Sequence, residues 1–218
     1  MWNGLRFAAL LCVSGVTSGQ NSYYFSSPQP LDSEASLSVS KNWHGKYENP
    51  EGVMAYEFSE DGVFAVSVSV MRISRESVRE SSQYDVRNGF LFGVVENDSV
   101  PCETDGEHYV FGIRNRACIA GEGSNNVLKK LDASRYLINY LENGHYVPVL
   151  FTFTKNKLEI ADFDYELEGE AFPYIAEKER SESSSGTKVL LKPTQAEFRE
   201  LQANAFVNRP VYKRKKAN

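Results

Sequence analysis

The chain has 218 residues, of which 41% are hydrophobic and 24% are charged, and its formal net charge is −5. This composition excludes a disordered polyanion and a protein made of many membrane-spanning helices, and it leaves a soluble globular chain with room for one ordinary domain. Twelve Tyr and thirteen Phe, with fifteen Gly and eight Pro, favour short strands and turns over a helical bundle. An all-β fold is therefore the first expectation.

The first nineteen residues have the profile of a signal peptide. A single Arg6 precedes the apolar run from Phe7 to Val13, and small residues follow as far as Gly19. The apolar run is too short for a membrane span, which needs about 20 apolar residues. The sequence thus predicts a signal peptide over 1–19 and a secreted protein, periplasmic or extracellular.

Removal of the signal peptide would also remove Cys12 and leave two cysteines, Cys102 and Cys118. Cysteines in an oxidising compartment usually pair, so the sequence predicts a disulfide bond between these two. His108 lies between them in sequence, and a catalytic Cys–His pair is the alternative interpretation. Proximity in sequence alone says little about the geometry that such a pair requires.

The rest of the chain divides by composition into five segments. Residues 20–42 are polar and rich in Ser, which predicts a flexible N-terminal arm. Over 43–170, short apolar or alternating segments separated by turn residues predict about eight or nine strands, a number that suits a closed antiparallel meander barrel without exposed edges. We then expect a mobile linker over 171–187, a strand and helix over 188–208, and a basic tail over 209–218.

Two local patterns refine this division. Thr194 and Glu197 form a capping-box pattern after Pro193, which predicts one C-terminal amphipathic helix packed on the barrel. In the segment 161–168, aromatic or apolar residues alternate with acidic ones such as Asp162. Because successive side chains of a strand point to opposite faces, we expect the acidic row on the solvated outside.

No residue pattern indicates a catalytic site, a metal site or a cofactor. His44, His108 and His145 do not have the spacing of zinc ligands, and no nucleophile elbow occurs. None of the 29 acidic residues lies in 1–19 or 209–218, so a basic tail stands beside an acidic body. The tail is a candidate contact for an anionic surface, whereas the acidic body argues against nucleic acid.

One predicted strand, 108–120, places Arg114 and Arg116 on the face opposite Tyr109 and Phe111. If the two aromatic residues face the core, the arginines are solvated. In the reversed register the arginines would point into a barrel lumen, where a guanidinium group can bind a carboxylate.

A longer signature begins with Trp43-His44-Gly45-Lys46-Tyr47 and continues with an aromatic-rich segment, Tyr56 to Phe64, that contains an Asp-Gly turn. This signature resembles secreted lipocalin-like domains of the calycin type. The resemblance implies an up-and-down barrel in which Trp43 closes one end beneath the lumen.

The sequence therefore predicts a secreted or envelope β-barrel without catalytic activity, which binds a small apolar or amphipathic ligand, such as a lipid, in its lumen. The alternative is a structural or protein-interaction domain whose barrel is filled by its own side chains. The candidate ligand contacts are Trp43, Tyr47, Tyr56, Phe64, Arg114 and Arg116.

Overall fold

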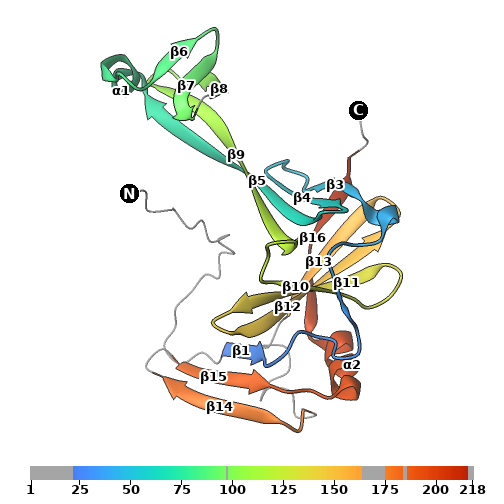
Figure 1. The fold of residues 1–218 in the computed structure, drawn as a ribbon. Coiled ribbons are helices and arrows are strands. Elements are labelled where there is room, and N and C mark those ends of the chain that lie inside the picture. The colour runs from blue at the N-terminus through green and yellow to red at the C-terminus, as the bar shows by residue number, and fades with distance from the viewer. Residues whose placement is uncertain (1–21, 97, 164–174, 184–185, 216–218) are drawn as a thin grey trace.

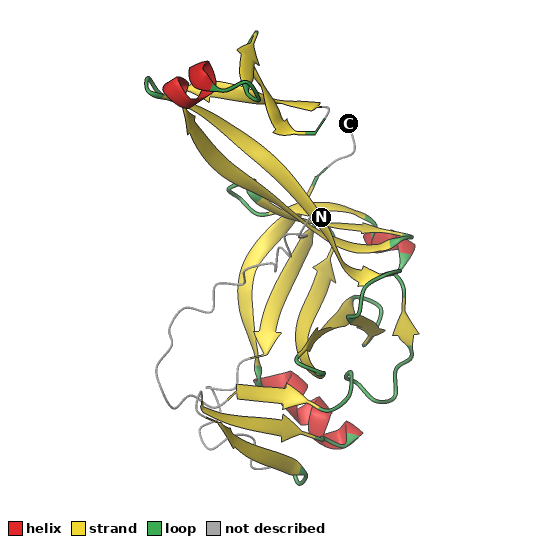
Figure 2. Ribbon diagram, turned by 60° about the vertical axis from the view of Figure 1, so that its left-hand side comes forward, coloured by secondary structure: helices red, strands yellow, loops and turns green. Residues whose placement is uncertain are grey.

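The computed structural model describes residues 22–96, 98–163, 175–183 and 186–215, and Figures 1 and 2 show its ribbon from two sides. Strands hold 60% of the described residues and helices 11%, so the prediction of an all-β fold with one main helix is confirmed. The predicted signal peptide, 1–19, lies outside the described residues.

A curved main sheet forms the body of the molecule (Figure 1). Its strands follow one another in space as β10 (Val127–Lys130), β11 (Arg135–Glu142), β12 (His145–Thr154), β13 (Lys157–Phe163), β16 (Phe206–Arg214), β3 (Gly45–Glu48), β4 (Met54–Ser59), β5 (Gly62–Ser74) and β9 (His108–Gly121). All of these ladders are antiparallel, as predicted.

The main sheet does not close into the predicted barrel. The strand β10 pairs with β11 on one side and with the short β2 (Ala35–Ser36) on the other, so β2 occupies the edge that closure would need. In turn, β9 pairs with β5 and with β8 (Asp98–Thr104). Within the described ranges, no ladder joins β10 to β9.

The concave side of the main sheet encloses an inner core of aromatic and aliphatic side chains. In the body of the molecule, side chains from one face of each strand point into this core, because successive side chains of a strand point to opposite faces. Its fully buried members include Tyr47, Tyr136, Ile138, Phe151, Phe153 and Leu158. The short 3₁₀ helix η1 (Lys41–Trp43) leads into β3 and adds Trp43 to the rim of this core.

A second layer covers the opposite face of β11, β12 and β13. It consists of β1 (Ser22–Phe25), β14 (Lys178–Ser183), β15 (Gly186–Leu191) and the helix α2 (Gln195–Asn204). Leu137 and Leu150 from the main sheet pack against Phe198 and Leu201 of α2, all of them buried. The three central strands are therefore buried on both faces.

The helix α2 begins where the sequence predicts. The hydroxyl of Thr194 accepts a hydrogen bond from the backbone N–H of Glu197 (3.4 Å), and the Glu197 carboxylate accepts one from the N–H of Thr194 (2.7 Å). This capping box satisfies backbone donors that have no partner inside the helix, which stabilises it by about 1 kcal/mol.

The segment predicted as a flexible arm, 20–42, is instead packed into the fold from residue 22 onward. The strand β1 lies parallel to β15 and beside β12, and Phe25 is fully buried. Farther along, the backbone N–H of Gln29 donates to Oδ1 of Asn139 (2.8 Å), and Nδ2 of Asn139 donates back to the Gln29 carbonyl (2.9 Å). The sequence prediction failed because the run of aromatic residues from Tyr23 to Phe25 is too short to show the alternation typical of a strand.

The predicted basic tail, 209–218, also needs correction. As far as Arg214 it belongs to β16, which lies between β13 and β3, and Tyr212 packs into the inner core. Alternation along this strand puts Tyr212 inside and Lys213 outside, so the basic residues are fixed on a sheet. The predicted linker, 171–187, likewise includes the strand β14, although part of it lies outside the described residues.

A small distal lobe stands apart from the body, at the end of a two-stranded ribbon made by β5 and β9 (Figures 1 and 2). It contains the helix α1 (Arg75–Glu80) and the strands β6 (Asp85–Arg87), β7 (Phe90–Val95) and β8. Val78, Leu91 and Phe111 form its own buried core. The ribbon therefore links two separately packed clusters.

The stacked contact between Trp43 and Phe153 generates a stability prediction. The ring centroids are 5.2 Å apart, and the indole N–H donates to the carbonyl of Ala133 (2.9 Å). Trp43→Ala should lower the free energy of unfolding by about 3–5 kcal/mol, measured by urea titration, because it opens a cavity at the rim of the inner core. The control Phe90→Ala, at an exposed position of the distal lobe, should change it by less than about 0.5 kcal/mol. Equal effects of the two substitutions would contradict a role for Trp43 in core packing.

Candidate functional site

The six predicted ligand contacts lie on two opposite faces of the main sheet. Tyr47 and Tyr56 stand opposite each other in the β3–β4 ladder and point to the inner core, to which Trp43 also belongs. The other three, Phe64, Arg114 and Arg116, lie on the convex outer face of β5 and β9. The structure brings these residues together in two groups, and no single site contains all six.

The inner group is packed tightly at one end of the core. Tyr47 is fully buried, its hydroxyl donates to the carbonyl of Trp43 (3.2 Å), and its ring meets Phe58 edge-on at 5.6 Å. Burial raises the pKa of the Tyr47 phenol, and the nearby Arg214 cation partly opposes this rise. Phe58 and Phe153 lie only 4.9 Å apart between centroids, so interlocking rings fill this part of the core.

Tyr56 belongs to a second cluster of the inner core, which joins three phenols to one carboxylate. The rings of Tyr56 and Tyr212 meet edge-on at 5.1 Å, and their hydroxyl groups are hydrogen-bonded. Burial raises the pKa of Tyr56 and Tyr140 strongly, and the negative charge of Asp162 raises both further. At neutral pH these groups are protonated phenols, suited to donating hydrogen bonds rather than to acting as bases.

The position of Asp162 corrects, for this residue, the prediction that the acidic residues of segment 161–168 lie on the solvated outside; Asp164, Glu166 and Glu168 lie outside the described residues. Asp162 shares a face of β13 with Leu158 and Ile160, both in the inner core, whereas Ala161 and Phe163 pack against the second layer. Its pairing opposite Val149 fixes this orientation. A strand buried on both faces has no solvated side, and alternation alone does not distinguish that case from a half-buried strand.

The outer group forms a compact ionic contact. Nε of Arg116 lies 2.9 Å from the Glu57 carboxylate, and Nη2 of Arg114 lies 2.5 Å from its other oxygen. The Arg116 guanidinium also covers the ring of Phe64, 3.4 Å from its centroid. The arginines are therefore on the solvated face, in agreement with the first of the two predicted registers.

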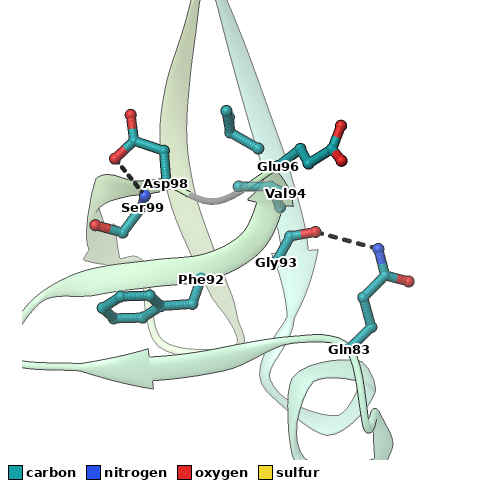
Figure 3. Close-up of a pocket in the computed structure, with 8 residues that line it drawn as sticks. Gln83, Phe92, Gly93, Val94, Glu96, Asp98 and Ser99 are labelled. Carbon is teal, nitrogen blue, oxygen red and sulfur yellow. Dashed lines mark hydrogen bonds between the residues drawn. The ribbon is translucent and has the colours of Figure 1, made fainter.

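The distal lobe carries an open pocket of about 670 Å³, shown in Figure 3. Gly93 lies at its wall with a positive φ of 88°, and a Cβ at this position would come within 2.0 Å of the Gln83 carbonyl. Nε2 of Gln83 donates to the carbonyl of Gly93 (3.1 Å), which ties β7 to the segment before β6. Glu96 and Asp98 give this pocket an acidic margin.

The predicted disulfide bond between Cys102 and Cys118 is not formed. Cys102, on β8, lies opposite Phe111 of β9, whereas Cys118 lies farther along β9, about 23 Å from Phe111 at ~3.3 Å per residue. A disulfide requires Cα atoms within about 7 Å. Both cysteines have free thiols. The extended β5–β9 ribbon holds the two cysteines apart. The number of residues between them in the sequence does not reveal that this ribbon is extended.

The free thiols should differ in reactivity. Cys118 is exposed, whereas Cys102 is half-buried and burial raises the pKa of its thiol, which lowers the fraction of reactive thiolate. Unreduced protein treated with a maleimide should therefore be labelled at Cys118 first and at Cys102 more slowly, as followed by peptide mass mapping. Failure of both to react until a reductant is added would show that they pair with each other after all.

The phenol cluster predicts loss of stability at high pH. An unfolded tyrosine ionises near pH 10, and the pKa of Tyr56 and Tyr140 is raised in the folded state. The stabilisation from these neutral phenols is fully present below about pH 10 and is lost as the pH rises above it. The urea midpoint of Tyr56→Phe should fall less between pH 8 and pH 11 than that of the wild type. The control Tyr109→Phe, in the distal lobe, should follow the wild-type curve, and identical curves for all three proteins would refute the linkage.

Across the described ranges, no cluster of three or more His, Cys, Asp or Glu side chains could hold a metal ion. Among the same residues, no helix has the length and apolar character needed to cross a bilayer. The chain matches no family model, no curated protein and no solved structure.

Proposed function

We propose that this chain is a non-catalytic interaction domain that binds an extended acidic segment of a partner polypeptide along the open edge of β5. The observation that carries this proposal is the length of β5 beyond its neighbour β4. The β4–β5 ladder ends with Met54 opposite Ser67, but β5 continues to Ser74. Over the described part of the chain, this extension has β9 as its sole ladder partner.

The exposed edge of this extension carries backbone groups suited to strand pairing. The N–H of Val68 donates to the carbonyl of Val53 (2.9 Å), on the side away from β9. Because the direction of backbone groups alternates along a strand, the N–H groups of Val70 and Arg72 point to that same side. An edge of this kind is a template for an added strand, with backbone hydrogen bonds supplying affinity.

Apolar side chains flank the edge. Val70 is 66% exposed, and Val53 and Val68 beside it are also exposed. Gly112 stands opposite Val70 in β9, and a Cβ there would come within 2.9 Å of the Val68 side chain. The absent side chain leaves a shallow apolar strip, against which alternate side chains of a docked strand can pack.

The charges near this strip favour a partner with carboxylates. Arg114 and Arg116 share the single carboxylate of Glu57, which leaves one positive charge in excess. Arg72 is largely exposed, and its Nε lies 3.6 Å from Asp105. Guanidinium groups bind carboxylates in a well-defined planar geometry, so acidic residues of the partner can be held in register.

The other predicted function, a small apolar ligand inside the sheet, is less well supported by the packing. The rings of Tyr47, Phe58 and Phe153 occupy the end of the inner core beside Trp43, and a ligand there would have to displace them. A core filled by its own side chains fits the alternative prediction of an interaction domain. Native mass spectrometry that finds a retained apolar molecule would favour the ligand instead.

The proposal can be tested with a fluorescent peptide of alternating Val and Glu, measured by fluorescence anisotropy. We expect saturable binding to the wild type, and at least about tenfold weaker binding by Val70→Pro, which removes one edge N–H without touching the β9 ladder. Val70→Glu should weaken binding similarly, through repulsion. Thermal unfolding of both variants checks that they remain folded.

Two controls make the result specific. Leu141→Glu places the same charge at another exposed apolar position, on β11, and should bind like the wild type. A Val–Lys peptide, and a Val–Glu peptide with Pro at alternate positions, should not bind. Absence of binding by the Val–Glu peptide, or equal binding of all three peptides, would overturn the proposal.

A further inference from the structure

A second pocket, of about 600 Å³, lies at the end of the main sheet and is lined mostly by basic residues. Three chain segments meet there: the β12–β13 turn, the end of β16 and the start of β3. Its lining comprises His44, Gly45, Asn156, Lys157, Lys213, Arg214 and Lys215. Strand pairing assembles this group from parts of the chain that are distant in sequence.

Two lysines of the pocket are held in an unfavourable position. Lys157 and Lys213 lie directly opposite each other in the β13–β16 ladder, and both side chains are exposed. Like charges at such positions repel each other and destabilise the sheet. Among the described residues, no ion pair compensates either of them.

The carboxylate that stands opposite Lys213 on β3 is already engaged. Glu48 is the neighbour of Lys213 on β3, but its two oxygens contact Lys46 (2.5 Å) and Lys215 (2.7 Å). The hydrogen bonds from Lys215 and Lys46 hold the pKa of the Glu48 carboxyl below its usual range, so the group is ionised at neutral pH. Each of its oxygens is already paired with a lysine other than Lys213. Glu159, on the same face of β13, stands opposite Val211. The pocket therefore keeps an excess of positive charge, in a chain whose net charge is −5.

A guanidinium group is fixed at the wall of the pocket. Nη2 of Arg214 donates to the carbonyl of His44, the guanidinium lies over the ring of Tyr47 at 5.9 Å, and the Arg214 backbone N–H donates to the carbonyl of Asn156 (2.8 Å). Gly45 makes this possible: its φ is 138°, and a Cβ there would lie 3.2 Å from Nε of Arg214. Arg214 stands opposite Tyr47 in the β16–β3 ladder, so its side chain starts from the inner face of the sheet, whereas those of Lys157 and Lys213 start from the outer face. The guanidinium therefore braces the end of the sheet that carries the two lysines.

We infer that this pocket binds a multiply charged oxyanion, the phosphate or sulfate group of a ligand, at the opposed ammonium groups of Lys157 and Lys213. Such a group supplies the negative charge that the two lysines lack and accepts several hydrogen bonds at once. The site shares no residue with the open edge of β5, so it goes beyond the proposed function and does not depend on it.

Pyrophosphate, titrated into the full-length protein by calorimetry at constant ionic strength, tests this inference. We expect saturable binding by the wild type and at least about tenfold weaker binding by Lys157→Gln/Lys213→Gln. The control Lys41→Gln/Lys130→Gln removes two exposed lysines outside the pocket and should bind within about twofold of the wild type.

Thermal unfolding separates a binding site from mere charge screening. Without added oxyanion, the pocket variant should have a higher Tm than the wild type, because substitution relieves the repulsion between Lys157 and Lys213. Pyrophosphate should raise the Tm of the wild type and the control, but not that of the pocket variant. Equal shifts in all three proteins, or no binding of either pyrophosphate or anionic vesicles, would overturn the inference.

Vesicles distinguish the possible sources of the phosphate. Flotation with phosphatidylcholine vesicles, with and without phosphatidylglycerol, is compared with the pyrophosphate titration. Lysine-dependent flotation without pyrophosphate binding would assign the site to lipid headgroups, whereas the reverse would assign it to a soluble phosphate. If the wild type binds no pyrophosphate and the pocket variant floats with the anionic vesicles as well as the wild type does, the inference is wrong.

Discussion

The burial of β12 on both faces is the constraint on which the rest of the structure depends. Phe151 and Phe153 project from one side of this strand into the inner core, and Leu150 projects from the other into the layer made by α2 and β15. The strand also pairs with three neighbours, β1, β11 and β13. Because no face of β12 is left for water, every element around it must bring apolar side chains, including the N-terminal segment that contains Phe25.

The parts of the fold that the sequence predicted well are those fixed by local chemistry. Asn143 and Gly144 have positive φ values of 50° and 80°, as the tight turn between β11 and β12 requires, and the Thr194 capping box starts the helix. Turn residues of this kind were enough to predict where strands occur. They did not predict which face of a strand is buried, because the orientation of Asp162 depends on a second layer formed by residues far away in sequence.

The candidate sites show the same division. Trp43 and Tyr47 were recognised from a short contiguous signature, and the structure places both in or beside the inner core. The opposition of Lys157 and Lys213, by contrast, arises only when β16 enters between β13 and β3. In the sequence these lysines belong to a turn and to what resembles a solvated terminus, so no local pattern could reveal the pocket.

The place of β16 also bears on how the molecule folds. Its end contacts the segment before β3 through the bond from Arg214 to His44, between residues 170 positions apart in the chain. Contacts between distant segments form slowly, because the entropy of closing the intervening chain is lost before the contact stabilises anything. Until β16 is in place, β13 and β3 each present a bare edge beside exposed aromatic side chains. The stage before β16 completes the sheet is thus one at which bare strand edges expose this protein to aggregation.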